Sequence, residues 1–324
     1  MKNPNWFAAI LGLMLAVPVA AQTPPDGYPR RPIELVVAYP AGGGMDVTAR
    51  TLAQEAQRVM GHEFRVQNRT GGAGMVGHSW LAQNVAPDGY TVGVLANPFL
   101  ALDIAVRGAP FKADQFLPIA GINFTPVLWV VKADGPLGKL DFRQIVEQAR
   151  QKPGELKIAT MPGNVFDFVA SIVEKHSGAK FTHVPFQGGR PGVTALLGGN
   201  VDIASAFYEE VEQYIKAGQV KAVAVSDSER FASLPDVPAM GEMGVEMGHG
   251  IWGASRFITV PPATPQPIRD YLEQGFLKVM RDPAAIEKFR AAGIALEPMD
   301  HAATQKAYAA SMQAIAEFTA GDKK

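Results

Sequence analysis

The sequence predicts an α/β protein built from two lobes, in which strands and helices alternate along the chain. Short apolar runs of strand length are separated by segments with helical spacing, an alternation typical of parallel, doubly wound sheets. An aromatic residue followed closely by a glycine pair ends the run at residues 35–38 and again the run at 181–185. Two extended runs, at residues 116–131 and 251–260, fit neither one ordinary strand nor a helix. Two lobes with equivalent turns, joined by two extended crossings, describe a clamshell with its cleft between the lobes.

The chain is organised around residues 33–50, which predict a strand, a bare turn and the start of a helix. Residues 35–38 suit a strand that is buried on both faces, and Tyr39 and Pro40 end it. Residues 41–44 carry almost no side chains, and a helix begins at or just before Asp46. This arrangement directs free backbone N–H groups and the positive end of a helix dipole into one small space. Because glycine lets a ligand touch the backbone, we expect this turn to form half of an anion site.

The remaining elements of the first half repeat this alternation. We expect a strand at 64–66, a glycine-rich turn at 68–74, a helix at 75–85 and a strand at 90–95. The run at 116–131 is broken by Gly121 and Pro126, so it predicts two extended pieces that meet there. The elements of a second series are then expected at 142–151, 157–160, 165–177, 181–185, 191–197, 201–206, 209–217 and 220–225.

Helix starts in the second half carry capping residues. Asp141 can cap the helix that ends at residue 151, and Asn164 with Asp167 resembles a capping box. Near the C-terminus, Thr264 before Pro265 and Asp282 before Pro283 predict two helix starts, Gly293 closes the second of these helices, and a last helix covers 302–318.

Composition excludes several classes of function. The 324 residues suffice for two domains, and 47% hydrophobic with 19% charged residues is ordinary for a globular protein. The formal net charge is −1 and no basic tract occurs, so we expect no nucleic-acid partner. The absence of cysteine removes disulfides, thiol catalysis and thiolate metal sites.

The N-terminus predicts an export signal at residues 1–21. Lys2 supplies the positive end, residues 7–17 the apolar core, and residues 19–21 a small-residue cleavage site, with cleavage after Ala21. The alternative is an uncleaved membrane anchor, but about 11 apolar residues cannot span ~30 Å of hydrocarbon. We therefore expect an exported protein located in the periplasm.

Enzyme and cofactor motifs are missing. The first glycine turn fails the dinucleotide pattern G-x-G-x-x-G because Val47 holds the last glycine position, and no Walker, G-x-S-x-G or H-E-x-x-H motif occurs. None of the six histidines lies four residues from another, so no helical metal site is predicted. We expect no enzyme activity, no cofactor and no metal; a secreted hydrolase is the alternative that lacks a recognisable nucleophile.

Several residues near the turns have two interpretations. Asp46 either caps its helix and pairs with Arg50 at i, i+4, or contacts the ligand. Aromatic residues cluster near the turns, and core packing is the default for each of them: Tyr39, Phe99, Phe166, Phe186, Phe207 and Tyr208. Tyr39 and Phe186 stand at strand ends beside glycine turns, where a ring can equally wall a pocket. Asn97 ends the third strand at the sheet edge where ligands of open parallel sheets bind, and residues 161–164 hold the matching place in the second lobe.

At these residues the chain resembles the extracytoplasmic solute receptors of tripartite tricarboxylate transporters, the Bug family. The resemblance covers essentially the whole mature chain, through these segments in order: YPRRPIELVVAYPAGGGMDVTAR (28–50), VQNRTGGAGMVG (66–77), APDGYTV (86–92), KPGELKIAT (152–160), VPFQGGRPGVTALLGGNVD (184–202) and IKAGQVKAVAV (215–225). It implies a type II periplasmic-binding-protein fold with a hinge of two crossover strands. Lobe 1 would comprise residues 22–124 and 248–324, and lobe 2 residues 125–247.

The resemblance also implies a function and a site. Family receptors bind small organic carboxylates, largely through backbone groups, and deliver them to a membrane permease. Here the ligand would be a di- or tricarboxylate or an aromatic acid, held by a monomer. The predicted ligand-binding residues are Tyr39, Ala41, Gly42, Gly43, Asp46, Asn97, Met161, Gly163, Asn164, Phe186, Gln187, Gly188, Phe207 and Arg256.

Two alternatives stay open at this point. Many family members read G-W-Y-G-L-F in the return crossing, where this chain reads IWGASRF at residues 251–257. Arg256 in that segment either forms a salt bridge in the hinge or clamps a second ligand carboxylate. The protein could also be a sensor subunit that presents the bound carboxylate to a signalling receptor.

Overall fold

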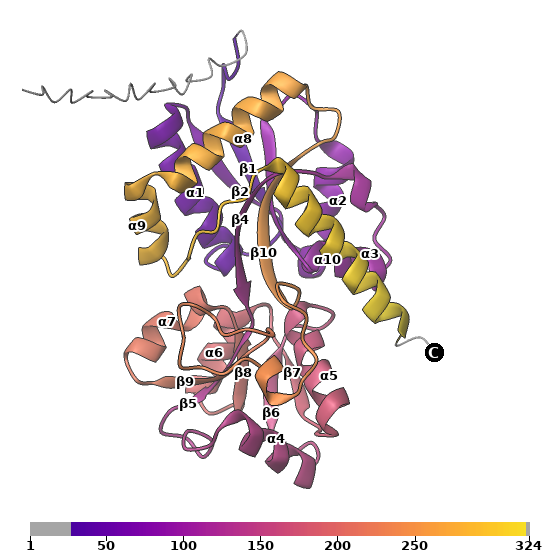
Figure 1. Ribbon diagram of the computed structural model, residues 1–324, viewed down its shortest axis with the longest axis vertical. Helices are drawn as coiled ribbons and strands as arrows, with labels where there is room; N and C mark the ends of the chain where they lie inside the picture. Colours follow the sequence, from indigo (N-terminus) through magenta and orange to yellow (C-terminus); the bar gives the residue numbers. More distant parts are fainter. Residues whose placement is uncertain (1–26, 322–324) are drawn as a thin grey trace, which may run out of the picture.

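A computed structural model describes residues 27–321, which fold into two lobes, each built on a five-stranded sheet. Figure 1 shows one lobe above the other, with one end of each of the long strands β4 and β10 at the junction between them. This arrangement confirms the predicted two-lobe α/β fold. The predicted export signal at residues 1–21 lies outside the described residues.

The first sheet has the strand order β2-β1-β3-β10-β4. Its strands are β1 (Ile33–Val37), β2 (Phe64–Asn68), β3 (Thr91–Asn97), β4 (Leu117–Pro126) and β10 (Gly253–Val260). β1 pairs in parallel with both β2 and β3, and Leu35, Val36 and Val37 are fully buried, as predicted for a strand covered on both faces. The helices of this lobe are α1 (Gly44–Met60), α2 (Met75–Asn84), α3 (Phe99–Ala105), α8 (Gln266–Arg281), α9 (Pro283–Ala291) and α10 (His301–Gly321).

The second sheet has the strand order β7-β6-β8-β5-β9. Its strands are β5 (Leu128–Lys132), β6 (Lys157–Thr160), β7 (Thr182–Pro185), β8 (Ile203–Ala206) and β9 (Val220–Val225). The helices of this lobe are α4 (Phe142–Gln151), α5 (Val165–Ser177), α6 (Gly189–Leu197) and α7 (Tyr208–Lys216). The long run at 116–131 is indeed two extended pieces, since β4 ends in one sheet and β5 begins the other.

The predicted parallel pairing is found for β1 with β2 and β3 and for β6 with β7 and β8, but each sheet also contains one reversed strand. β10 is antiparallel to β3 and β4, and β5 is antiparallel to β8 and β9. The physical reason is the crossing between lobes. β5 and β10 each enter their lobe at the junction and run away from it, whereas their neighbours run toward it. The carboxyl ends of β1, β3, β6 and β8 therefore all face the other lobe.

Some predicted caps form and others do not. The Asp141 carboxylate accepts the Gln144 N–H at 2.8 Å, and Asp282 accepts the Ala285 N–H at 3.0 Å, as expected. The predicted capping box of Asn164 and Asp167 is wrong, because Asn164 makes no side-chain cap and Asp167 turns toward other partners. Thr264 is also not a cap, since α8 starts at Gln266 behind Pro265 and the buried Thr264 hydroxyl has no hydrogen bond within residues 27–321.

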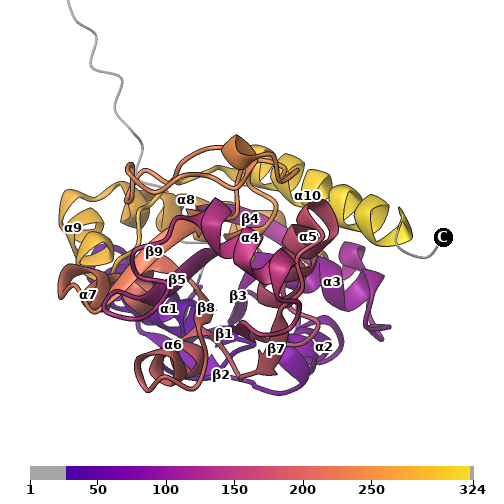
Figure 2. The ribbon, with the colours of Figure 1, turned by 90° about the horizontal axis from the view of Figure 1, so that it is seen from below.

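The C-terminal helix extends beyond its own lobe. In Figure 1 α10 runs past α3 toward the second lobe, on the side where α5 lies, and Figure 2 shows it from below along one edge of the molecule. Near its end, Phe318 meets Trp252 edge to face, with 4.8 Å between ring centroids, and Trp252 stacks on Phe168 of α5. The segment that leads into β10 is thus fixed between the two lobes by aromatic packing.

Candidate functional site

A cavity of about 230 Å³ lies between the lobes, where the ends of the strands meet. The first lobe contributes the turn between β1 and α1 and the start of α3, while the second contributes the turns that precede α5, α6 and α7. Its lining comprises Tyr39, Pro40, Ala41, Gly42, Gly43, Gly44, Met45, Phe99, Met161, Asn164, Phe166, Gln187, Gly188, Gly189, Arg190, Pro191, Phe207 and Glu210. This is the sheet edge at which parallel sheets place their ligands.

The turn before α1 presents backbone to the cavity. Gly42 has a φ of +81°, a conformation that favours glycine, and Gly43 precedes the helix with ordinary extended angles and no side-chain cap. Among the described residues, no acceptor bonds the N–H groups of Gly44 and Met45. The first turn of α1 therefore keeps the free donors that the sequence predicts for it.

Asp46 holds this turn in shape and does not line the cavity. Its carboxylate accepts the Gly42 N–H at 2.8 Å, the Arg50 Nε at 2.9 Å and the Asn68 amide at 2.9 Å. Burial alone would raise the pKa of Asp46, but these hydrogen bonds more than offset that effect and hold it below its usual value. Of the two interpretations of Asp46, the contacts match the structural one, with Arg50 as its partner.

Aromatic rings form the walls of the cavity. Phe99 lies 5.3 Å from Tyr39 and 6.1 Å from Phe207, and Phe166 lies 5.0 Å from Phe207, measured between ring centroids. Phe99 and Phe166, for which core packing is the default, face the cavity, whereas Phe186 packs on the core of the second lobe instead. Aromatic residues occur beside the turns at several strand ends, and the sequence alone does not show which of their rings face the cavity.

Arg256 lies outside the cavity, in a buried ion pair. Its guanidinium pairs with the Glu209 carboxylate, and Nη1 donates to the Thr125 hydroxyl at 2.8 Å. Both charged side chains have no exposed surface. Arg256 comes from β10 of the first lobe and Glu209 from α7 of the second, so the contacts match the hinge salt bridge.

Two charged residues that line the cavity were missed by the prediction. Arg190 follows the glycine pair in the matched segment, and its buried Nε has no hydrogen bond within residues 27–321. Glu210 is buried, and its Oε2 accepts the Phe207 N–H at 2.9 Å. Burial, with a smaller contribution from Glu209, raises the pKa of Glu210 to about 7, even though Arg190 and Arg256 act in the opposite direction. The glycine pair directly before Arg190 could have indicated that this residue lies near the cavity. Glu210 gives no such indication, because acidic residues are common in the first turn of any helix.

The predicted residues thus divide into two groups. Those that line the cavity are Tyr39, Ala41, Gly42, Gly43, Met161, Asn164, Gln187, Gly188 and Phe207. Those that do not are Asp46, Asn97, Gly163, Phe186 and Arg256. Asn97 is buried, and its amide has no hydrogen bond among the described residues.

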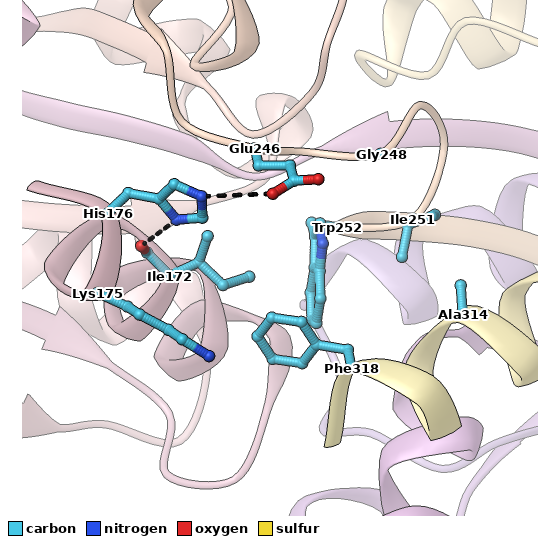
Figure 3. A pocket seen from close by; sticks show the side chains of 9 residues that line it. All are labelled: Ile172, Lys175, His176, Glu246, Gly248, Ile251, Trp252, Ala314 and Phe318. Atoms are coloured by element: carbon cyan, nitrogen blue, oxygen red, sulfur yellow. Dashed lines mark hydrogen bonds and ion pairs between the residues drawn. The ribbon is translucent and has the colours of Figure 1, made fainter. Parts of the chain in front are cut away.

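A second cavity, of about 530 Å³, shares no lining residue with the first (Figure 3). Its walls come from α5, the segment 246–252 and the end of α10, and His176 and Glu246 face each other across its rim with 3.7 Å between Nε2 and the carboxylate. None of its lining residues lies at the carboxyl end of a strand, where parallel sheets place their ligands, so size alone does not make it the better candidate.

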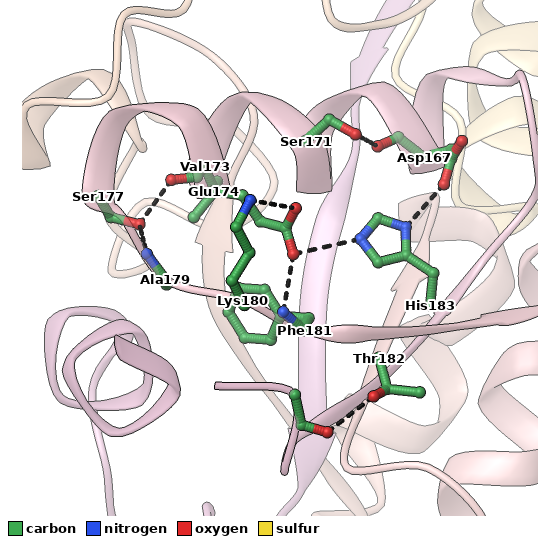
Figure 4. Close-up of polar contacts among 11 residues, drawn as sticks. Asp167, Ser171, Val173, Glu174, Ser177, Ala179, Lys180, Phe181, Thr182 and His183 are labelled. Atoms are coloured by element: carbon green, nitrogen blue, oxygen red, sulfur yellow. Dashed lines mark hydrogen bonds and ion pairs between the residues drawn. The ribbon is translucent and has the colours of Figure 1, made fainter. Parts of the chain in front are cut away.

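An ion-pair cluster supports the second-lobe turn at residues 161–164 (Figure 4). Asp167 accepts the Gly163 N–H at 3.2 Å and contacts His183 Nδ1 at 2.8 Å, and Glu174 lies 3.5 Å from His183 Nε2. The hydrogen bond with Asp167 raises the pKa of His183, although burial opposes it. The turn that lines the cavity therefore depends on a titratable pair.

We expect the variant His183→Gln to lose stability mainly at acidic pH. Because the pKa of His183 is raised in the folded protein, its charged form stabilises the fold fully below the unfolded value of about 6.5, and this contribution disappears as pH rises through the folded pKa. The loss should be roughly 0.5–1 kcal/mol at pH 5.5 and smaller at pH 8.5, measured by urea denaturation. His62→Gln is the control, since among the described residues His62 contacts the Tyr271 ring and makes no ion pair. An equal loss at both pH values would contradict the prediction.

Residues 27–321 can be compared with the requirements of a metal site and of a membrane-spanning helix. No group of three or more metal-ligating side chains is close enough to hold a metal ion in this part of the chain. None of its helices is long and apolar enough to cross a membrane.

Comparison with known proteins gives consistent results. Residues 48–317 match the tripartite tricarboxylate transporter family receptor. The chain is 30% identical to protein BugT of Bordetella pertussis over 297 residues, which cover 90% of this chain and 89% of BugT. Among solved structures, the periplasmic binding protein BugD superposes with a TM-score of 0.77 at 25% identity, covering 90% of this chain and 97% of that one. A Rhodopseudomonas palustris protein solved with adipate gives a TM-score of 0.79 at 24% identity, covering 91% and 98%.

These matches agree with the resemblance seen in the sequence and with the two-lobe architecture. The family consists of periplasmic solute-binding receptors rather than enzymes. The chain belongs to the tripartite tricarboxylate transporter receptor family, as a solute-binding receptor of the Bug type.

Proposed function

We propose that this receptor captures a small organic carboxylate between its lobes and delivers it to a tripartite tricarboxylate-type membrane permease. The observation that carries the proposal is the interlobe cavity, which is lined by backbone turns of both lobes and by Arg190. The free N–H groups at the start of α1 lie at the positive end of the helix, a suitable environment for a carboxylate. The structure of the R. palustris protein with adipate, a dicarboxylate, supports a carboxylate ligand.

The mechanism is hinge closure without chemistry. The crossing strands β4 and β10 join the lobes, and a ligand that touches both lobes binds the closed form better than the open one. Only such a difference in contact can shift the balance between open and closed forms. We place the lobe boundaries as the sequence suggests, with lobe 1 at 22–124 and 248–324 and lobe 2 at 125–247.

The proposal includes where the receptor acts and which protein it meets. Cleavage near Ala21 would release a periplasmic monomer, a form suited to hinge closure. The permease would recognise the closed, loaded receptor. A sensor role would differ only in the partner, and pull-down with the permease against a sensor-kinase ectodomain separates the two.

Thermal shift against a panel of organic acids tests the proposal. The mature protein is melted with aliphatic and aromatic mono-, di- and tricarboxylates, with the corresponding neutral amides as controls. An acid present at 100 times its Kd should stabilise the fold by about 2.7 kcal/mol, because it binds only the folded state. If no acid raised the Tm above its amide, the carboxylate proposal would be wrong.

A further inference from the structure

We propose that the interlobe cavity selects a monocarboxylate with a flat, apolar body, and that Glu210 is the residue that disfavours a second carboxylate. This inference rests on the proposed function, because it names the class of carboxylate that the same cavity would take. Three features of the cavity carry it: the aromatic walls, the number of available cations, and the acids placed beside its helix starts.

The walls favour an apolar ligand body. Phe99, Phe166 and Phe207 form a continuous series of rings, with neighbouring centroids 6.1 Å and 5.0 Å apart, and Tyr39 extends it beyond Phe99 at 5.3 Å. Met161 adds a further apolar side chain. Rings at these separations offer faces and edges to another ring, whereas a strongly hydrated citrate-like ligand would leave polar groups unpartnered against them.

Within residues 27–321, one cation is available to a ligand in the cavity. Among the described residues that line it, Arg190 is the single basic side chain, and its buried Nε has no hydrogen bond there. Arg256, which could have held a second carboxylate, is neutralised by Glu209 and further bonded to Thr125. One guanidinium with an unused donor matches one carboxylate.

Acids already stand beside both helix starts at the cavity. A β-carbon added at Gly44, the first residue of α1, would collide with the Glu209 carboxylate. Likewise, one added at Gly189, the first residue of α6, would collide with the Glu210 carboxyl group. The start of α6 thus faces the Glu210 carboxyl group, whereas the N–H groups of Gly44 and Met45 at the start of α1 stay without an acceptor among the described residues. A ligand whose first carboxylate lies at α1 would place a second one at the α6 end of the cavity, against Glu210.

The titration of Glu210 makes this discrimination depend on pH. The charged groups that face it are Glu209, Arg190 and Arg256, and its Oε2 also accepts the Phe207 N–H. Burial raises the pKa of Glu210 to about 7, so the carboxyl group is mostly neutral below that pH and mostly charged above it. A second ligand carboxylate nearby would raise this pKa further, so binding a diacid above pH 7 must take up a proton. Diacid affinity should therefore fall as pH rises above 7, while monoacid affinity changes little.

Benzoate and terephthalate test the inference, because they share one ring and differ by one carboxylate. Both are titrated calorimetrically into the mature protein and into two variants, Glu210→Gln and Glu212→Gln. Glu212 lies on the same helix as Glu210 but outside the cavity lining, so it is the matched control. At pH 8 we expect the native protein to bind benzoate at least tenfold more tightly than terephthalate. Glu210→Gln should bring this ratio within about threefold, and Glu212→Gln should leave it unchanged.

The outcomes distinguish this inference from the proposed function. Terephthalate or adipate binding as tightly as benzoate at pH 8 overturns the inference and supports the carboxylate receptor. If the Glu210→Gln variant keeps the native Tm and the native ratio of benzoate to terephthalate affinity, Glu210 does not determine selectivity and its assigned role is wrong. Absence of binding by any mono- or diacid overturns both.

Discussion

Gly43→Val is expected to weaken ligand binding by roughly 100-fold while the fold remains intact. Gly43 has φ −77° and ψ 167°, angles that valine adopts readily. An added β-carbon would meet only the Pro40 carbonyl oxygen, at 3.4 Å, so the first carbon fits. The two methyl groups would then occupy the space beside the free N–H groups of α1, and filling a well-shaped site costs about 1–3 kcal/mol. Calorimetry with the tightest acid of the panel measures the loss.

The control for this variant is Gly198→Val. Gly198 follows the C-terminal end of α6, and the cavity lies at the other end of that helix. Gly198 also has a negative φ, of −76°, and is exposed outside the cavity. The Gly198→Val variant should bind the acid as tightly as the native protein, and Gly43→Ala should lose less affinity than Gly43→Val. Both valine variants should melt within about 3 °C of the native protein, since neither strains the backbone. Native affinity in a folded Gly43→Val variant would remove the turn before α1 from the site.

Arg256→Met is expected to destabilise the protein by about 3–5 kcal/mol, because it leaves the Glu209 carboxylate buried without its counter-ion. Glu209→Gln should also be strongly destabilising, since it leaves the Arg256 charge unpaired. The double variant should lose less than the sum of the two, because it contains no unpaired charge. Urea denaturation at pH 7 measures the free energy of unfolding of all four proteins.

An exposed pair provides the comparison for Arg256. Arg290 and Glu287 are paired on α9 with side chains 68% and 66% exposed, so Arg290→Met should cost less than about 0.5 kcal/mol. Under conditions where Arg256→Met is folded, its affinity for the acid should stay within threefold of native, as for a hinge salt bridge. An affinity loss above 30-fold without loss of stability would instead assign Arg256 to the ligand.

The elements themselves could be predicted because local physics fixes them. The apolar run of β1, the bare turn after it and the start of α1 at Gly44 all agree with the sequence, as do the caps at Asp141 and Asp282. Where prediction failed, a tertiary contact was stronger than a local one. Instead of forming a capping box with Asn164, Asp167 accepts the N–H of Gly163 through one carboxylate oxygen and contacts His183, 16 residues away, through the other.

The sequence alone determined the alternating strands and helices and the glycine turns, because strand length, helical spacing and turn residues are encoded within short segments. The family was indicated by the order in which matching segments follow one another along the chain. Only the tertiary structure decided which side chains face the cavity and which charges are already paired. Arg256 finds Glu209, 47 residues away, and Glu210 reaches the cavity wall, because the fold brings α7 against the first lobe. Such pairings depend on the energy of burying a charge in a particular place, and no local pattern records that place.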